Sequence, residues 1–128
     1  EANFVYNRQI GFEFRVASIV IGDGESWDFC PATVSEQLTP FKNWNEPENL
    51  AAWHLFDACD VTSAIGVSFV GTICKGFNRG LSWRSGSTWL TFAHEMGHLF
   101  GASHSFEEGQ GTTGGIMDYG DKKLNGEY

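Results

Sequence analysis

The chain has 128 residues, a length that fits a single domain with a core of its own. Its 8 Lys and Arg against 16 Asp and Glu give a net charge of −8, which disfavours nucleic acid or an anionic membrane surface as the partner, because binding phosphate requires a basic surface. Hydrophobic residues make up 41% of the chain, so it is expected to fold. The longest nearly apolar run, residues 16–21, is shorter than the roughly 20 residues that cross a bilayer, so no membrane insertion is expected.

Two elements are predicted before residue 50. Residues 12–21 alternate between apolar and polar or small side chains until a glycine-rich turn follows, a pattern typical of a strand. Residues 36–44 carry apolar side chains at helical spacing, but Pro40 interrupts them. The second element is therefore expected to be a short or kinked helix.

Two strands and a longer helix are predicted further along. Residues 53–56 and 66–72 are short apolar segments bounded by Asp and Gly, which favours strands, and the polar, glycine-containing residues 76–86 are predicted to connect to the helix. Residues 87–100 are apolar at helical spacing, and Gly101 stands where a left-handed residue would end the helix. The polar residues 102–128 are expected to form loops, so the whole predicts an α+β fold.

The most informative stretch runs from His94 to His104. On a helix His94 and His98 lie one turn apart on the same face, so both imidazoles can bind one metal ion. A chain reversed at Gly101 can bring His104 back as a third nitrogen ligand, which leaves a fourth position for water, whose pKa a divalent cation lowers to about 7. Glu95 is placed to accept that proton. A lone histidine is usually a packing or surface residue, but this combined spacing predicts a zinc site.

The stretch resembles the signature of the metzincin zinc peptidases, His-Glu-x-x-His-x-x-Gly-x-x-His, at every defined position. That family also has a Met-containing turn beneath the metal, and residues 115–119 are similar to it, with Met117 as the candidate Met-turn residue. The resemblance implies a Zn²⁺-dependent endopeptidase that hydrolyses internal bonds of extended peptides or proteins. Glu95 would be its catalytic general base, and His94, His98 and His104 its metal ligands.

Residues 53–56 and 66–74 are similar to the reprolysin (adamalysin) branch of this family, in which a Val-Gly-Thr-x-Cys run forms an edge strand beside the cleft. Ser105 departs from that branch, which usually has Asp after the third histidine. Unpaired backbone groups on an edge strand can accept an extended peptide as a further strand, although an ordinary sheet edge would look the same. The residues assigned to substrate binding on this basis are Gly66, Val67, Ser68, Phe69, Val70 and Gly71.

The resemblance also implies a twisted mixed sheet whose edge strand packs on the active-site helix. Metzincin domains begin with a strand and a long helix and close with a helix after the Met-turn. Residues 1–128 are therefore expected to be one catalytic domain that is incomplete at both ends. A secreted or cell-surface location is implied as well, together with a propeptide and accessory domains outside this chain.

The remaining candidates receive structural interpretations. Cys30, Cys59 and Cys74 are an odd number and allow at most one internal bridge. By resemblance Cys74 pairs with a residue beyond this chain, which leaves Cys30 with Cys59 as a candidate bridge. Tyr119 is expected in the pocket wall, although astacins and serralysins have a metal-reaching Tyr at that place. His54 is expected to be a strand-side histidine, and Glu107 and Glu108 are expected in a solvated turn.

Other classes of function stay open. A metzincin-like module could bind zinc or mediate adhesion without catalysis, but the presence of Glu95 disfavours it. A purely structural zinc site is disfavoured because such sites are closed by four protein ligands. A zinc hydrolase acting on small amides would use the same residues, and the predicted edge strand favours peptides over it.

Overall fold

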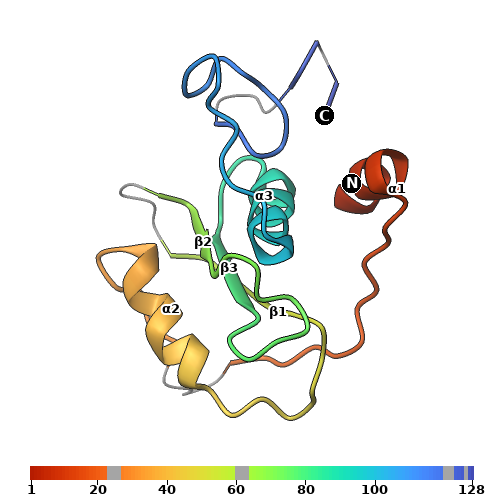
Figure 1. Ribbon diagram of the computed structural model, residues 1–128. Coiled ribbons are helices and arrows are strands. Elements are labelled where there is room, and N and C mark those ends of the chain that lie inside the picture. Colours follow the sequence, from red (N-terminus) through yellow and green to blue (C-terminus); the bar gives the residue numbers. More distant parts are fainter. Residues whose placement is uncertain (23–26, 60–63, 120–122, 126) are drawn as a thin grey trace.

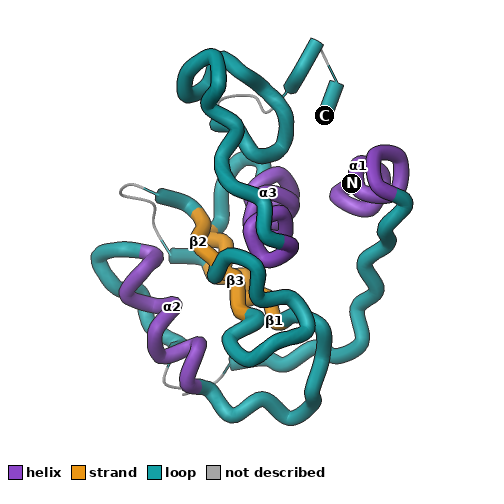
Figure 2. Tube along the Cα trace, viewed as in Figure 1, coloured by secondary structure: helices purple, strands orange, loops and turns teal. Residues whose placement is uncertain are grey.

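The computed structural model describes residues 1–22, 27–59, 64–119, 123–125 and 127–128. The elements of the described residues are, in order, α1 (Ala2–Ile10), α2 (Val34–Asn43), β1 (Trp53–Asp57), β2 (Gly66–Ser68), β3 (Arg79–Trp83) and α3 (Thr88–Phe100). In the sheet β1 and β2 flank β3, and Figure 1 shows the strands between α2 and α3. The chain beyond α3 forms loops over that helix (Figure 2). The architecture is α+β, as predicted.

The sheet is mixed. β1 runs parallel to β3, and β2 runs antiparallel to it on the other side, so the described part of β2 lies at a sheet edge. Both strands predicted around residues 53 and 66 are confirmed, although the second ends at Ser68 rather than at residue 72. The predicted edge strand beside the long helix is therefore present.

The connection predicted at residues 76–86 is wrong, because it contains the central strand β3. Leu81 and Trp83 face α2 and pack there with its apolar side chains, whereas Gly80 and Ser82 alternate with them and face α3. All five residues of β3 are buried. The sequence analysis missed this strand because one of its faces carries only small residues, Gly80 and Ser82, so that the stretch looks like a polar, glycine-containing connection.

On β2 and β3, the face of the sheet toward α3 is lined with small residues, which lets the helix approach the edge strand closely. Gly66 pairs with Ser82 and Ser68 pairs with Gly80 across the β2–β3 ladder. A Cβ placed on Gly66 would lie 2.6 Å from Thr91 Cγ2 of α3, a separation that real atoms do not adopt. Any larger residue at this position would force the Thr91 and Glu95 side chains of α3 to shift.

The opposite face of the sheet supports the main apolar core. The predicted helix around Pro40 is confirmed as α2, which includes that proline and begins with Glu36 Oε2 accepting a hydrogen bond from the Thr33 backbone N–H at 3.3 Å. The disulfide between Cys30 and Cys59 is also confirmed, and it ties the segment before α2 to the end of β1. The buried residues of this core are Trp27, Val34, Leu38, Phe41, Trp53, Cys59, Leu81 and Trp83.

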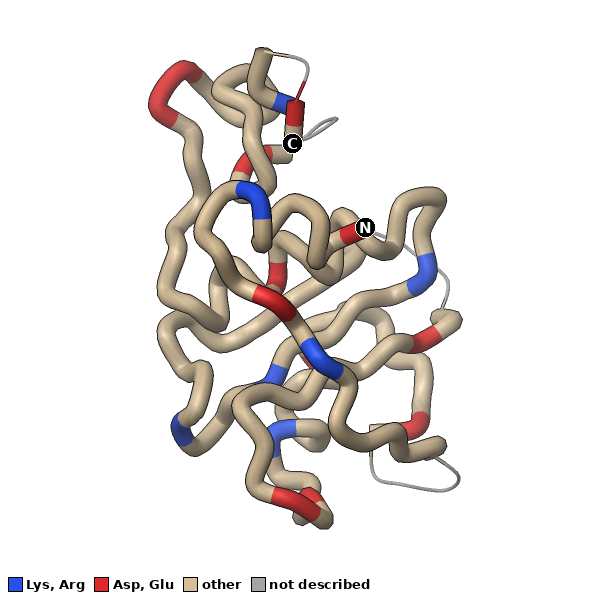
Figure 3. Tube along the Cα trace, turned by 90° about the vertical axis from the view of Figure 1, so that its right-hand side faces the viewer, with Lys and Arg blue, Asp and Glu red and all other residues tan. Residues whose placement is uncertain are grey.

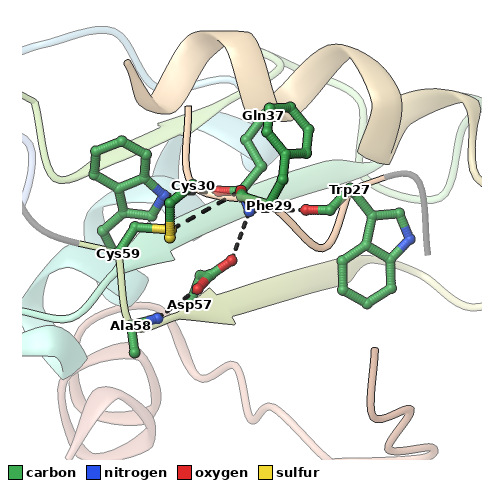
Figure 4. Close-up of a disulfide and its surroundings, with 8 residues drawn as sticks. Trp27, Phe29, Cys30, Gln37, Asp57, Ala58 and Cys59 are labelled. Atoms are coloured by element: carbon green, nitrogen blue, oxygen red, sulfur yellow. Dashed lines mark hydrogen bonds between the residues drawn. A yellow bond between two sulfur atoms is a disulfide. The ribbon is translucent and has the colours of Figure 1, made fainter. Parts of the chain in front are cut away.

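A single buried amide connects this core to the disulfide segment (Figure 4). The Gln37 Nε2 group lies within hydrogen-bond distance of Asp57 Oδ2 at 2.6 Å, the Trp27 carbonyl at 2.9 Å and the Phe29 carbonyl at 3.0 Å. Its Oε1 accepts from Trp83 Nε1 at 2.7 Å. The two Nε2 hydrogens are shared among three acceptors, and Gln37 thereby connects α2 to β1, to β3 and to residues 27–29 before the disulfide.

The N-terminal region differs from the prediction. Helix α1, which the sequence analysis did not predict, ends at Gly11 in the left-handed conformation (φ 66°). Residues 12–22 form an extended chain, drawn in Figure 1 between α1 and the region of α2, and not a strand. Within the described residues no strand pairs with this segment, and Val16, Ile19 and Ile21 are exposed. The alternating pattern was read correctly, but a strand also requires a neighbour for its backbone groups.

Helix α1 is fixed to α3 instead of to the sheet. The Tyr6 hydroxyl donates to the Ala93 carbonyl at 2.6 Å, and Asn3 exchanges two side-chain hydrogen bonds with the backbone of Phe14. Tyr6 and Phe14 pack edge to face with ring centroids 4.8 Å apart.

None of the helices in the described ranges has both the length and the apolar character that spanning a bilayer demands.

Replacing Gln37 with Leu is expected to lower the free energy of unfolding by about 2–4 kcal/mol, because the buried partners of the amide lose their hydrogen bonds while the apolar volume stays similar. Urea denaturation followed by tryptophan fluorescence measures the change. Gln110→Leu, at an exposed loop position, is the matched control. Equal stabilities of the two variants would show that this network contributes little.

Candidate metal centre

Three imidazoles converge at the C-terminal end of α3. The Nε2 atoms of His94 and His98 are 3.1 Å apart, those of His98 and His104 are 3.2 Å apart, and those of His104 and His94 are 3.1 Å apart. Nitrogens around a tetrahedral zinc ion with bonds of about 2.0 Å lie about 3.3 Å from one another. The three nitrogens therefore form a triangle of the size that one zinc ion requires.

The helix and its end produce this arrangement. His94 and His98 lie one turn apart on α3, and the helix stops at Gly101, whose φ of 107° lies in the left-handed region. The Ala102 backbone N–H donates to the Gly97 carbonyl at 2.9 Å, which folds the chain back along the helix end. His104 then reaches the other two rings from the returning chain.

The chemistry of the donor set also fits a metal. His94 Nδ1 lies 2.7 Å from the Ile116 carbonyl, and His98 Nδ1 lies 2.8 Å from the Ala102 carbonyl. Because a carbonyl oxygen only accepts, each Nδ1 must carry the hydrogen, and in the neutral ring the lone pair is then on Nε2. The described residues thus direct imidazole lone pairs to a common point, and carbonyl partners of this kind orient zinc-binding histidines.

Glu95 follows His94 directly on α3, and its side chain lies next to the edge strand. Its residue is 4% exposed, and its Oε2 accepts a hydrogen bond of 2.6 Å from the Ser68 hydroxyl. Gly66 leaves room for the other carboxylate oxygen, since a Cβ there would lie 2.6 Å from Oε1. The candidate general base is therefore enclosed between α3 and β2.

The turn around Met117 packs against α3 at Gly97, the residue before His98. The Met117 sulfur occupies the space where a Cβ on Gly97 would lie, so the helix and the turn touch at a glycine. The Ser105 backbone N–H donates to the Met117 carbonyl at 3.1 Å, which joins the turn to the residue after His104. The turn contacts His94 directly through the Ile116 carbonyl, and it contacts the chain next to His104 through Ser105.

Asp118 organises this turn and was missed in the sequence analysis. Its side chain is fully buried and accepts hydrogen bonds from the backbone N–H groups of Gly114 at 2.6 Å and of Gly111 and Tyr119 at 2.7 Å each. Burial alone would raise the pKa of the Asp118 carboxyl, but the backbone hydrogen bonds, which include Thr113, outweigh it and hold the pKa below its ordinary value. An Asp among closely spaced glycines was the available signal.

Two aromatic rings stand beside the histidines. Phe106 stacks on His104 with ring centroids 4.7 Å apart and 11° between the planes, and Tyr119 meets His104 at 5.0 Å and His94 at 6.0 Å. Sequence reasoning named Tyr119 but missed Phe106. Glu107 and Glu108 lie exposed in a turn, which agrees with the expectation for them.

His54 lies apart from the three histidines, on the sheet. Its Nε2 is 2.9 Å from Ser82 Oγ, and its ring packs against Phe92 and Phe56 at 4.9 and 4.8 Å. Burial lowers the pKa of His54 to about 3, so the ring is neutral near pH 7. Within the described ranges His54 belongs to none of the groups that could hold a metal ion. Cys74 is a free, exposed thiol.

Comparison with known proteins gives the family. The sequence model of Metallo-peptidase family M12, reprolysin type, matches residues 1–123. The chain therefore belongs to this metallopeptidase family, and it is a reprolysin-type metzincin. Membership supports a metalloprotease-type function with peptide substrates, and the group of His94, His98 and His104 fits the zinc dependence of the family.

Individual relatives are similar over part of the chain. "Disintegrin and metalloproteinase domain-containing protein B" of Aspergillus fumigatus is 25% identical over 127 residues, which cover 80% of this chain and 16% of the relative. The protein of the same name in Arthroderma otae is 29% identical over 90 residues, covering 56% of this chain and 11% of that relative. The chain thus spans less than a fifth of the length of either protein.

Charges are distributed without a single dominant patch in the view of Figure 3, where acidic and basic positions are spread over several segments of the trace. One partly buried pair joins Arg79 Nη2 to Glu46 Oε2 at 2.5 Å. The ion pair of Arg8 with Glu127 is exposed. Exposed ion pairs contribute little to the free energy of folding.

Replacing Asp118 with Asn is expected to weaken zinc binding by about 10- to 100-fold, because the turn loses the charge that holds its backbone N–H groups, and the Ile116 carbonyl then orients His94 less firmly. Competition with a chelating dye measures the affinity. Glu107→Gln, an exposed acid-to-amide change in the same loop region, is the control and should bind as the parent does.

Replacing His54 with Gln is expected to flatten the pH dependence of stability. The folded-state pKa of about 3 lies below the ordinary value of 6.5, so His54 contributes stability that is present above pH 6.5 and is lost as pH falls toward 3. Between pH 7 and pH 4 the urea midpoint should fall more steeply for the parent than for the variant, because the parent takes up as much as one more proton on unfolding. Parallel curves for parent and variant would contradict this environment for His54.

Proposed function

We propose that this chain is the catalytic part of a zinc-dependent endopeptidase that hydrolyses internal peptide bonds of extended protein substrates. The observation that carries the proposal is the convergence of the three imidazole Nε2 atoms within 3.2 Å of one another at the end of α3. His94, His98 and His104 are proposed to hold the zinc ion. They are three protein ligands, which is the number used by catalytic zinc sites with an open position.

Glu95 is proposed to act as general base and then as general acid. A zinc ion held by these histidines would supply Lewis acidity, which would lower the pKa of water toward neutral and polarise a substrate carbonyl. The Glu95 carboxylate would accept the proton of the attacking water and deliver it to the leaving amine. Its enclosure between α3 and β2 fixes the carboxylate and excludes bulk water from one side of it.

The edge strand is proposed to position the substrate. β2 pairs with β3 on one side, and an extended peptide could add to its other side through backbone hydrogen bonds. The residues proposed for this contact are Gly66, Val67, Ser68, Phe69, Val70 and Gly71. Their position beside the helix that carries Glu95 supports peptides over small amides as substrates.

The Met-turn and the context of the chain complete the proposal. Met117 is proposed to support the site from below through its packing at Gly97. The Cys30–Cys59 disulfide supports a secreted or cell-surface location, because such bonds persist in oxidising compartments. Residues 1–128 are proposed to be one incomplete catalytic domain, with a propeptide and accessory domains elsewhere in the full protein.

A catalytically silent zinc-binding module is the alternative. It would keep the three histidines and need no general base. The buried and hydrogen-bonded Glu95 favours the catalytic reading, because an acidic side chain is costly to bury and contributes nothing to zinc binding by three histidines.

Replacing Glu95 with Gln in the full-length protein is expected to leave zinc content unchanged and to lower kcat for an unfolded, carboxymethylated protein substrate by at least about 100-fold, because the amide cannot accept the proton. Zinc is measured by elemental analysis and cleavage by mass spectrometry of the fragments. Glu108→Gln is the matched control and should retain activity.

Removal of zinc with a chelator should abolish cleavage by the parent, and stoichiometric zinc should restore it. If the zinc-loaded parent binds one ion and cleaves neither proteins nor small amides, the silent module replaces the endopeptidase.

A further inference from the structure

Two residues of β2 contact the Glu95 carboxylate from one face of the strand. The Ser68 hydroxyl lies 2.6 Å from Glu95 Oε2 and 3.0 Å from the Glu95 backbone carbonyl. Gly66, two residues earlier and therefore on the same face, leaves the space in which Oε1 lies. Residues of β2 thus restrict the position of both carboxylate oxygens of Glu95.

The two contacts of Ser68 differ in strength. A hydroxyl has one hydrogen to donate, and the carboxylate is the closer acceptor and the charged one. A short hydrogen bond from a hydroxyl to a carboxylate is about twice as strong as a neutral one. The bond therefore fixes the rotation of the Glu95 side chain, and it also joins α3 to β2.

The backbone geometry makes Ser68 a rigid support. Ser68 pairs with Gly80 in the β2–β3 ladder, and the Phe69 backbone N–H donates to the Arg79 carbonyl at 3.2 Å. A donor on a paired strand moves less than one on a loop, so the carboxylate is held to the sheet rather than to a mobile side chain.

We propose that Ser68 is a positioning residue that holds the Glu95 carboxylate in the orientation for proton transfer, with Gly66 as the space that permits it. This inference rests on the proposed function. It assigns the Ser68 side chain a role distinct from the backbone contacts of the edge strand, because the hydroxyl points to α3 while peptide addition uses backbone groups.

The test compares Ser68→Ala with the parent in the full-length, zinc-loaded protein, using a quenched fluorescent peptide made from the first cleavage site found in the carboxymethylated substrate. We expect kcat to fall about 10- to 100-fold, since a small misplacement of a catalytic group has an effect of this size, with KM within about twofold of the parent. Zinc content should not change.

Ser85→Ala is the matched control. The Ser85 hydroxyl is buried and has no hydrogen-bond partner within the described part of the chain, so its removal should leave kcat unchanged. Gly66→Ala is the second variant and tests the same carboxylate from the other oxygen, because the new Cβ would lie 2.6 Å from Oε1 and 2.6 Å from Thr91 Cγ2, so that both side chains must shift. It is expected to lower kcat as Ser68→Ala does, and it decides the question if Ser68→Ala does not fold.

Crystal structures of the zinc-loaded parent and of Ser68→Ala provide a readout that does not depend on activity. The Glu95 carboxylate should move by about 1 Å or adopt two conformers in the variant. An unmoved carboxylate, or an unchanged kcat in a folded Ser68→Ala, overturns the inference. If the parent itself cleaves nothing, the proposed function fails, while the structures still decide whether Ser68 holds Glu95.

Discussion

The close approach of α3 to the sheet is the constraint on which the site depends. Gly66 removes a side chain that would press against Thr91 and Glu95 of α3, Gly80 leaves room for His54 and Ser68 on the neighbouring strands, and Ser68 and Ser82 add only small polar groups. Because the helix lies so near the edge strand, its one acidic residue meets the strand directly. With bulky residues on this face, the helix would stand further out and Glu95 would lose its hydrogen-bond donor.

The opposite side of the same helix is fixed by polar contacts to the chain around it. The Tyr6 hydroxyl holds α1 to α3, and the Met117 turn packs against Gly97, where the helix again has no side chain. The buried Asp118 carboxylate gathers the backbone N–H groups of that turn. In this way a loop region rich in glycine supplies a carbonyl that orients a histidine, which an untethered loop could not do.

Local sequence signals predicted the helix that carries the histidines, because apolar spacing and Gly101 depend on near neighbours alone. The reprolysin resemblance correctly indicated the family, the edge strand and the candidate disulfide. The central strand β3 was missed because its glycine and serine face carries no hydrophobic pattern. For residues 12–22 the error was the opposite one. Their alternating pattern predicted a strand, but no strand of the described residues pairs with them.

Within the candidate site, the spacing of the histidines predicted their placement on one helix and its returning chain, and the structure brings the three rings together. The supports of the site were not predictable in the same way. Ser68 meets Glu95 from a segment 27 residues away in the chain, and no local pattern specifies such a pair. The contacts of Phe106 with His104 and of Asp118 with its own turn are local, but they depend on how an irregular loop folds, which no helix or strand periodicity specifies.

The most direct test of the account is zinc X-ray absorption spectroscopy on the purified, zinc-loaded protein. We predict three imidazole nitrogens at about 2.0–2.1 Å and one oxygen from solvent, without sulfur in the coordination shell. Loss of one imidazole contribution in each of His94→Ala, His98→Ala and His104→Ala would follow. A shell closed by four protein ligands, or one that contains the Cys74 sulfur, would contradict an open three-histidine site.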